Sequence, residues 1–215
     1  INYIKEINNF SDFDSKKLNV LIAPPAIHLE SIHSTSSFSL VAQNVSDQDK
    51  GAFTGEISAQ MLSRYVKHVI IGHSERRQLF LESNLIIKKK IAMCFQYDLS
   101  PIFCFGENKE SRIQGDYLNC IKAQIEEVLF DLDLSKINNV ILAYEPIWAI
   151  GTGDTASSKQ IEEVHDYVRN LLVSKFGQSV GVCIPILYGG SCNSDNVGSI
   201  LSHLNVNGLL IGGAS

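Results

Sequence analysis

Short apolar runs separated by helical patterns restrict this chain to folds built from alternating strands and helices. Seven such runs occur, near Val20–Ala23, Leu40–Gln43, Val69–Ile71, Ile102–Phe105, Val140–Tyr144, Ile184–Tyr188 and Gly208–Ile211. Most are continuously apolar instead of alternating, which is typical of strands covered on both faces, as in parallel sheets. We therefore predict seven parallel strands.

Helical spacing fills the segments between the runs. One set of apolar residues recurs every three or four positions: Leu118, Ile121, Ile125, Val128 and Leu129. A second set, Ile161, Val164, Val168, Leu171 and Leu172, follows Ser157 and Gln160, which predict a capping box at the start of that helix. No linker or low-complexity stretch interrupts the alternation, so we predict a single α/β domain over residues 1–215.

The order of the elements predicts a (β/α)8 barrel. Tyr3, Ile4, Ile7 and Phe10 stand at helical spacing ahead of the first run, and the chain stops at Ser215, just after the last run. One strand in front and one helix behind would complete eight βα units, which usually need about 250 residues. We expect such a barrel with its first strand and last helix absent from these 215 residues. An open doubly wound sheet is the alternative, because periodicity alone does not separate the two.

Composition narrows the classes of function. The net charge is −5 with both signs interspersed, so we predict no nucleic-acid surface. No apolar run reaches the length of a membrane span, so no membrane association is expected. The five cysteines form no C-x-x-C pair, which favours reduced thiols in a cytoplasmic protein over disulfides or a zinc site.

Polar or glycine-rich segments follow most of the predicted strands. They are Gln43-Asn44, Gly72–Arg77, Gly106-Glu107, Glu145, Gly189–Ser191 and Gly212-Gly213. The carboxyl ends of barrel strands meet at one rim, where the active sites of this fold lie. One such segment alone is commonly a turn, but six on one rim indicate an active site.

His73 and Glu145 are the candidates for acid–base chemistry. Ser74 and Glu75 suit the first turn of a helix, and a helix N-terminus at His73 would disfavour the imidazolium form. A neutral imidazole donates a hydrogen bond to a substrate carbonyl. Glu145 ends a buried run, where partial desolvation would raise its basicity. For either residue alone, a structural role is the commoner one.

The segment after Glu145 and the last glycines predict a lid and a phosphate site. Pro146–Ala156 has an apolar tip and glycines at 151 and 153, which suit a lid that excludes water. Glycine lets a backbone approach an anion closely, and Gly189-Gly190-Ser191 and Gly212-Gly213 follow successive strands. Cys104 lies inside an apolar run, which favours a packed core thiol over a nucleophile.

Five segments resemble triosephosphate isomerases, in order, through nearly the whole chain. They are Gly51–Glu56, His73–Arg77, Tyr144–Gly153, Tyr188–Ser191 and Gly212–Ser215, and the third is highly specific to that family. The resemblance implies a TIM barrel. It also implies an isomerase of glycolysis and gluconeogenesis that interconverts dihydroxyacetone phosphate and D-glyceraldehyde 3-phosphate through an enediolate.

The resemblance further implies a role for each matching residue. Glu145 is implied to be the general base, and His73 the electrophile that polarises the carbonyl. The phosphate is implied to bind backbone N–H groups of Gly151, Ser191, Gly212 and Gly213, with Tyr188 and Ser191 latching the lid. Supporting residues are implied at Asn44, Ser74, Glu75 and Cys104. The implied site holds no metal and no organic cofactor.

The resemblance implies a homodimer in which the loop around Thr54 inserts into the neighbouring subunit. One part of the family pattern has no match, namely a first strand that ends in an asparagine and a substrate-binding lysine. Lys5, Lys16 and Lys17 do not stand in that context. A barrel that binds phosphate with little or no turnover is therefore the alternative hypothesis. A different sugar-phosphate barrel enzyme is disfavoured by the lid segment.

Overall fold

The computed structural model describes residues 18–33, 36, 38–151 and 154–213. They fall into two compact units: unit one takes the chain up to Ile71 together with Lys89–Pro101, and unit two takes Gly72–Lys88 and the chain from Ile102 onward. The single domain over residues 1–215 stays a prediction. The predicted first helix and the three lysines from Lys5 to Lys17 lie outside the described residues, as do Thr152, Gly153, Ala214 and Ser215.

Unit one contains three parallel strands that pair in chain order: β1 (Leu21–Ile22), β2 (Ser39–Ala42) and β3 (His68–Ile71). The Ser100 N–H donates to the Lys67 carbonyl at 2.8 Å, so the next strand starts beside β3. Its helices are η1 (Ala26–His28), α2 (Leu29–His33), α3 (Ala59–Leu62) and the second half of α5 (Asn84–Gln96).

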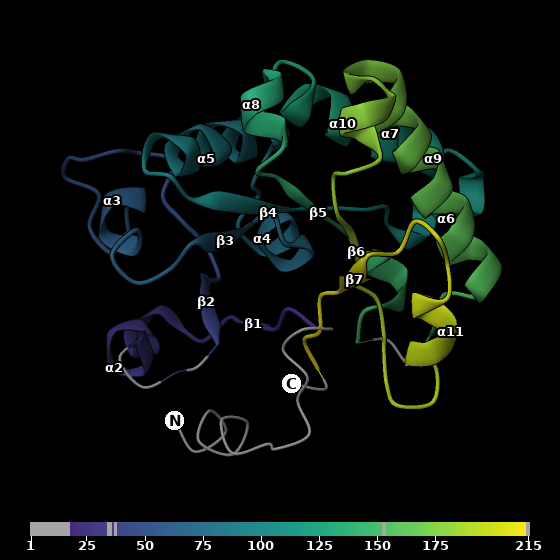
Figure 1. Cartoon of the computed structure of the whole chain (residues 1–215), viewed down its shortest axis with the longest axis horizontal. Helices are drawn as coiled ribbons and strands as arrows, with labels where there is room; N and C mark the ends of the chain where they lie inside the picture. The colour runs from purple at the N-terminus through teal and green to yellow at the C-terminus, as the bar shows by residue number, and fades with distance from the viewer. Residues whose placement is uncertain (1–17, 34–35, 37, 152–153, 214–215) are drawn as a thin grey trace. The chain divides into compact units, whose positions relative to one another are not determined.

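Unit two contains four parallel strands: β4 (Ser100–Phe105), of which the part from Ile102 onward belongs to this unit, β5 (Ile141–Tyr144), β6 (Ile186–Tyr188) and β7 (Gly208–Leu209). Cys104 lies opposite Ala143, and Tyr188 lies opposite both Tyr144 and Leu209. Its other elements are α4 (Ser74–Leu79), α6 (Lys109–Gln114), α7 (Tyr117–Leu129), α8 (Leu134–Ile137), η2 (Ile147–Ala149), α9 (Ser158–Phe176), α10 (Gln178–Gly181) and α11 (Val197–Leu201). Helices α7, α9 and α10 lie together beside β5 and β6 (Figure 1).

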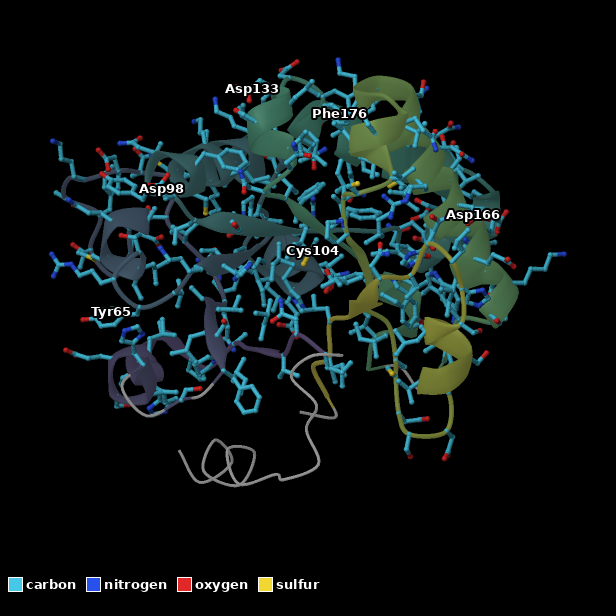
Figure 2. All side chains as sticks on the ribbon, viewed as in Figure 1. Tyr65, Asp98, Cys104, Asp133, Asp166 and Phe176 are labelled. Carbon is cyan, nitrogen blue, oxygen red and sulfur yellow. The ribbon has the colours of Figure 1, made fainter. Side chains whose placement is uncertain are left out.

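Local sequence explains the two long helices of unit two. The periodic residues Ile121, Ile125, Val128 and Leu129 of α7 are all buried. Helix α9 begins at the predicted capping box, in which Ser157 and Gln160 exchange side-chain and backbone hydrogen bonds. Charged side chains of the helices and their connections, such as Asp133 and Asp166, lie at the periphery, whereas Cys104 of β4 lies inside (Figure 2).

The seven predicted strands are confirmed, and so is the α/β barrel class. Within each unit the strands pair in chain order, without the order reversal that a doubly wound sheet contains. The bounds differ slightly: β6 begins at Ile186 and not at Ile184, because Pro185 has no N–H for the ladder. Among the described residues, no helix is long and apolar enough to cross a membrane.

Two helical glycines are expected to respond oppositely to alanine. A Cβ at Gly181 would lie 2.5 Å from Cα and 2.6 Å from N of Val173, whereas a Cβ at Gly198 would meet no heavy atom within 4 Å. Gly181→Ala should lower the free energy of unfolding by about 1–3 kcal/mol through overpacking. Gly198→Ala should raise it by about 0.5–1 kcal/mol through helix propensity. Urea denaturation of both variants would contradict this if the two midpoints moved in the same direction.

Candidate active site

The backbone of β4 places Glu145 at the carboxyl end of β5. The Glu145 N–H donates to the Phe105 carbonyl at 2.8 Å, which continues the ladder one residue beyond the strands. The side chain is almost fully buried, with 2% of the residue exposed. Its Oε2 accepts from the Ser74 N–H at 2.8 Å, and its Oε1 lies 3.0 Å from Nε2 of His73. The structure therefore brings together three of the predicted site residues.

Two glycines make room for the base. A Cβ at Gly106 would lie 1.8 Å from the Glu145 carbonyl oxygen, and a Cβ at Gly189 would lie 3.0 Å from Cγ of Glu145. Gly106 is also fixed through both of its polar groups by Gln124, which accepts from the N–H and donates to the carbonyl. The glycine after β4 and the glycine after β6 thus enclose Glu145 from two neighbouring strands.

His73 stands directly before α4 as its N-cap residue. Its Nδ1 accepts from the Glu75 N–H at 3.4 Å, so in the neutral ring the proton lies on Nε2. Nε2 then donates to Oε1 of Glu145. The Glu75 side chain itself is largely exposed, with Oε2 3.7 Å from Nδ1.

The carboxylate contact changes the expected protonation of His73. The hydrogen bond to Glu145 raises the pKa of His73 above its ordinary value, burial lowers it, and the charges of Glu145 and Glu75 raise it further. The sequence-based expectation of a neutral imidazole considered only the N-terminus of α4. A direct carboxylate at 3.0 Å opposes that effect, because charge–charge attraction at contact exceeds the influence of one helix end.

Glu107 is a buried carboxylate that the sequence reasoning noted only as part of a strand end. It is 0% exposed, and its Oε1 accepts from Nε1 of Trp148 at 2.8 Å and from the Tyr144 hydroxyl at 3.1 Å. Its carbonyl accepts from the Ile147 N–H, and Arg112 lies 3.6 Å from the carboxylate. Burial raises the pKa of Glu107 despite these donors. The first residues of the predicted lid are thus fastened to the end of β4.

Ser191 holds the next residue of the lid. Its N–H and its hydroxyl both donate to the Ala149 carbonyl, at 3.2 and 2.8 Å. Tyr188 is 1% exposed, and its hydroxyl has no hydrogen-bond partner among the described residues. A Cβ at Gly190 would lie 2.2 Å from that hydroxyl and 2.9 Å from Cγ of Pro146. The Gly189–Ser191 segment therefore packs on the base of the lid.

The remaining predicted phosphate-binding residues are exposed glycines. Gly151 has a φ of 67°, a left-handed conformation that favours glycine. Gly212 and Gly213 follow β7, which pairs with β6, so these two glycines and the Gly189–Ser191 segment come after neighbouring strands. The predicted phosphate contacts remain predictions.

Two predicted supporting residues have different surroundings. Cys104 is fully buried in β4, and burial raises the pKa of its thiol well above the usual range, as expected for a core residue. Asn44 belongs to unit one, where its Oδ1 accepts from Nζ of the buried Lys90 at 2.7 Å. Within the described ranges, no group of three or more His, Cys, Asp or Glu side chains could hold a metal ion.

A carboxylate and an imidazole in contact at the carboxyl ends of parallel barrel strands define a class of enzymes that move protons on small substrates. The family model that matches residues 1–215 is that of triosephosphate isomerase, and the chain belongs to this family. It is therefore an isomerase.

Curated relatives agree with the family. Triosephosphate isomerase of Porphyromonas gingivalis is 44% identical over 201 residues, which cover 92% of this chain and 80% of the relative. That of Cytophaga hutchinsonii is 45% identical over the same coverage, 92% and 80%. That of Amoebophilus asiaticus is 43% identical over 217 residues, which cover 98% of this chain and 86% of the relative.

The pKa of His73 should depend on Glu145. Glu145→Gln removes the attractive charge and leaves the burial that lowers the pKa, so the His73 pKa should fall. Glu75→Gln should lower it less, because the Glu75 charge is the smallest of the four causes. NMR titration of the imidazoles measures both shifts. His165, whose pKa burial lowers to about 4, serves as an internal control. An unchanged His73 pKa in Glu145→Gln would show that the contact does not persist in solution.

Proposed function

We propose that this chain interconverts dihydroxyacetone phosphate and D-glyceraldehyde 3-phosphate, with Glu145 as the base and His73 as the electrophile. The observation that carries the assignment of roles is the 3.0 Å contact between Glu145 Oε1 and His73 Nε2. Membership of the triosephosphate isomerase family supports the substrate and the reaction. This reaction belongs to glycolysis and gluconeogenesis.

The proposed step is a proton transfer between neighbouring carbons. Glu145 takes a proton from the carbon beside the carbonyl, and the C–H electron pair forms the double bond of an enediolate. The carbonyl oxygen gains negative charge, which the Nε2–H of His73 stabilises. Glu145 then returns the proton to the other carbon. Because the Ser74 N–H and His73 hold the carboxylate, Glu145 has to release these donors to act as a base.

The glycines are proposed to hold the phosphate. Backbone N–H groups of Gly151, Ser191, Gly212 and Gly213 would bind its oxygens, which anchors the substrate while the lid excludes water. Attachment of the lid base to Glu107 and Ser191 supports a hinge at that end. No observation favours the alternative of a barrel that binds phosphate without turnover.

Replacement of Glu145 should abolish most of the turnover. We expect kcat to fall by about 10²–10⁴-fold in Glu145→Gln, which lacks a base. It should also fall in Glu145→Asp, because the shorter side chain places the carboxylate farther from the substrate carbon. Glu162→Gln, on the exposed face of α9, is the matched control and should be unchanged. Isomerisation and proton exchange are measured for each. Full activity of Glu145→Gln would contradict the assignment of the base, and an inactive wild-type chain would contradict the proposed function.

We also propose that the chain forms a homodimer. In unit one, the loop around Thr54 and the following helix expose Phe53, Ile57 and Met61, at 44%, 37% and 58%. In unit two, Leu79, Phe80, Leu81 and Leu85 are all between 64% and 79% exposed. Clustered apolar side chains on the surface mark interaction sites. A second copy of this chain is the proposed occupant.

A charge in the apolar set of unit two should prevent dimer formation. Phe80→Asp places a carboxylate where the proposed contact excludes water, so the protein should sediment as a monomer at concentrations where the wild type is a dimer. Leu204→Asp is the matched control, since Leu204 is 92% exposed, follows α11 and belongs to neither set. A dimeric Phe80→Asp variant would contradict the proposed surface.

A reducing compartment, the cytoplasm, is proposed for the protein. All five cysteines are free thiols, and Cys94 and Cys104 are buried. Burial raises the pKa of the Cys94 thiol to about 12, which keeps it protonated and unreactive. Locating the tagged full-length protein in cells would test the proposal, and retention in an oxidising compartment would contradict it.

A further inference from the structure

Arg77 is a half-buried arginine close to the site, and the proposed reaction leaves it without a role. Its Nε donates to the Gly72 carbonyl at 2.9 Å, and its terminal nitrogens donate to the Cys104 carbonyl at 3.2 Å and to Oδ1 of Asn84 at 2.8 Å. Among the described residues, no carboxylate lies within ion-pair distance of this guanidinium. All three acceptors are neutral oxygens, two of them backbone carbonyls.

The backbone of the same residue reaches the other side of His73. The Arg77 N–H donates to the His73 carbonyl at 3.1 Å. The Gly72 carbonyl belongs to the peptide before the Cα of His73, and the His73 carbonyl belongs to the peptide after it. The Arg77 side chain therefore holds the peptide plane before His73, whereas the plane after it is held by the backbone N–H groups of Arg76, at 2.8 Å, and Arg77. The planes determine φ and ψ of His73, at −47° and 141°, and with them the direction of its side chain.

Gly72 makes this turn possible. Its φ is 75°, a conformation that side chains disfavour, and a Cβ would lie 2.9 Å from Cδ1 of Ile87 and 3.2 Å from the Cys104 carbonyl oxygen. The chain is thus pressed against β4 where Arg77 binds it. Because glycine itself adopts many backbone conformations, the bond from the guanidinium to the Gly72 carbonyl restrains the orientation of this peptide.

The bond to Cys104 connects the turn with the base. The Cys104 carbonyl accepts from Arg77, and the next carbonyl along β4, that of Phe105, accepts from the Glu145 N–H at 2.8 Å. Consecutive carbonyls of one strand thus hold the turn of His73 and the backbone of Glu145. The third bond of Arg77 leads through Asn84 to Oε2 of Glu127 on α7, which orients the guanidinium plane.

We propose that Arg77 is a positioning residue that fixes the His73 imidazole relative to the Glu145 carboxylate through β4. The inference rests on the proposed function of His73 and Glu145. A forked guanidinium satisfies all three acceptors at once, whereas an ammonium group cannot reproduce the planar fork. Loss of the fork therefore frees the peptide before His73, and the imidazole moves away from the geometry that the reaction requires.

The test compares Arg77→Lys with Arg169→Lys. Arg169 is the control, because its guanidinium also donates to several neutral oxygens: the carbonyls of Gly181 and Ile184, ahead of β6, and the side chains of Asn205 and Asn207, ahead of β7. Both variants should lose stability. Only Arg77→Lys should lower kcat per folded molecule, by about ten- to a hundredfold, with a smaller change in KM. If Arg77→Lys does not fold, Asn84→Ala takes its place in the test. This variant removes one acceptor of the guanidinium and keeps Arg77 itself, so its kcat should fall by less than the drop expected for Arg77→Lys.

NMR titration of His73 gives a readout independent of turnover. In Arg77→Lys the His73 pKa should move from its raised value toward 6.5, since a displaced ring loses the Glu145 contact, whereas Arg169→Lys should leave it unchanged. An inactive wild type would overturn the proposed function, but the His73 titration would still decide the role of Arg77. Unchanged kcat and His73 pKa in both Arg77→Lys and Asn84→Ala would overturn the inference.

Discussion

Strands β4 and β5 approach so closely at their carboxyl ends that a side chain at residue 106 has no room, because its Cβ would lie 1.8 Å from the Glu145 carbonyl oxygen. The site depends on this approach. Four successive residues, which belong to β4 and to the segment directly after it, each hold a different part of the site. Cys104 binds Arg77, Phe105 binds the backbone of Glu145, Gly106 binds Gln124, and Glu107 binds the lid base.

Two buried carboxylates at neighbouring strand ends illustrate how surroundings divide the roles. Glu145 contacts an imidazole and one backbone N–H, partners that a small movement of the side chain can release. Glu107 is fully buried and is held by the side chains of Trp148, Tyr144 and Arg112. The first arrangement suits a group that exchanges protons, and the second suits a fixed anchor.

The sequence predicted the strands and the two principal residues because both depend on local patterns. Continuous apolar runs located all seven strands, and the polar residues after them located His73 and Glu145. Local patterns do not show which partners meet in space. The pairing of Glu145 with Ser74 spans 71 positions and that of Trp148 with Glu107 spans 41, so neither the raised pKa of His73 nor the anchoring of the lid could be read from spacing.

The Ala149–Ser191 contact has a thermodynamic consequence for any anion that binds at this loop. Ser191 has one amide hydrogen, and the Ala149 carbonyl already accepts it. A phosphate oxygen that takes this hydrogen has to displace the carbonyl, so the anion and the Ala149 carbonyl compete for one donor. The two equilibria are therefore linked: the contact of Ala149 with Ser191 weakens the apparent affinity for such an anion, and an anion bound to the Ser191 N–H in turn weakens this contact.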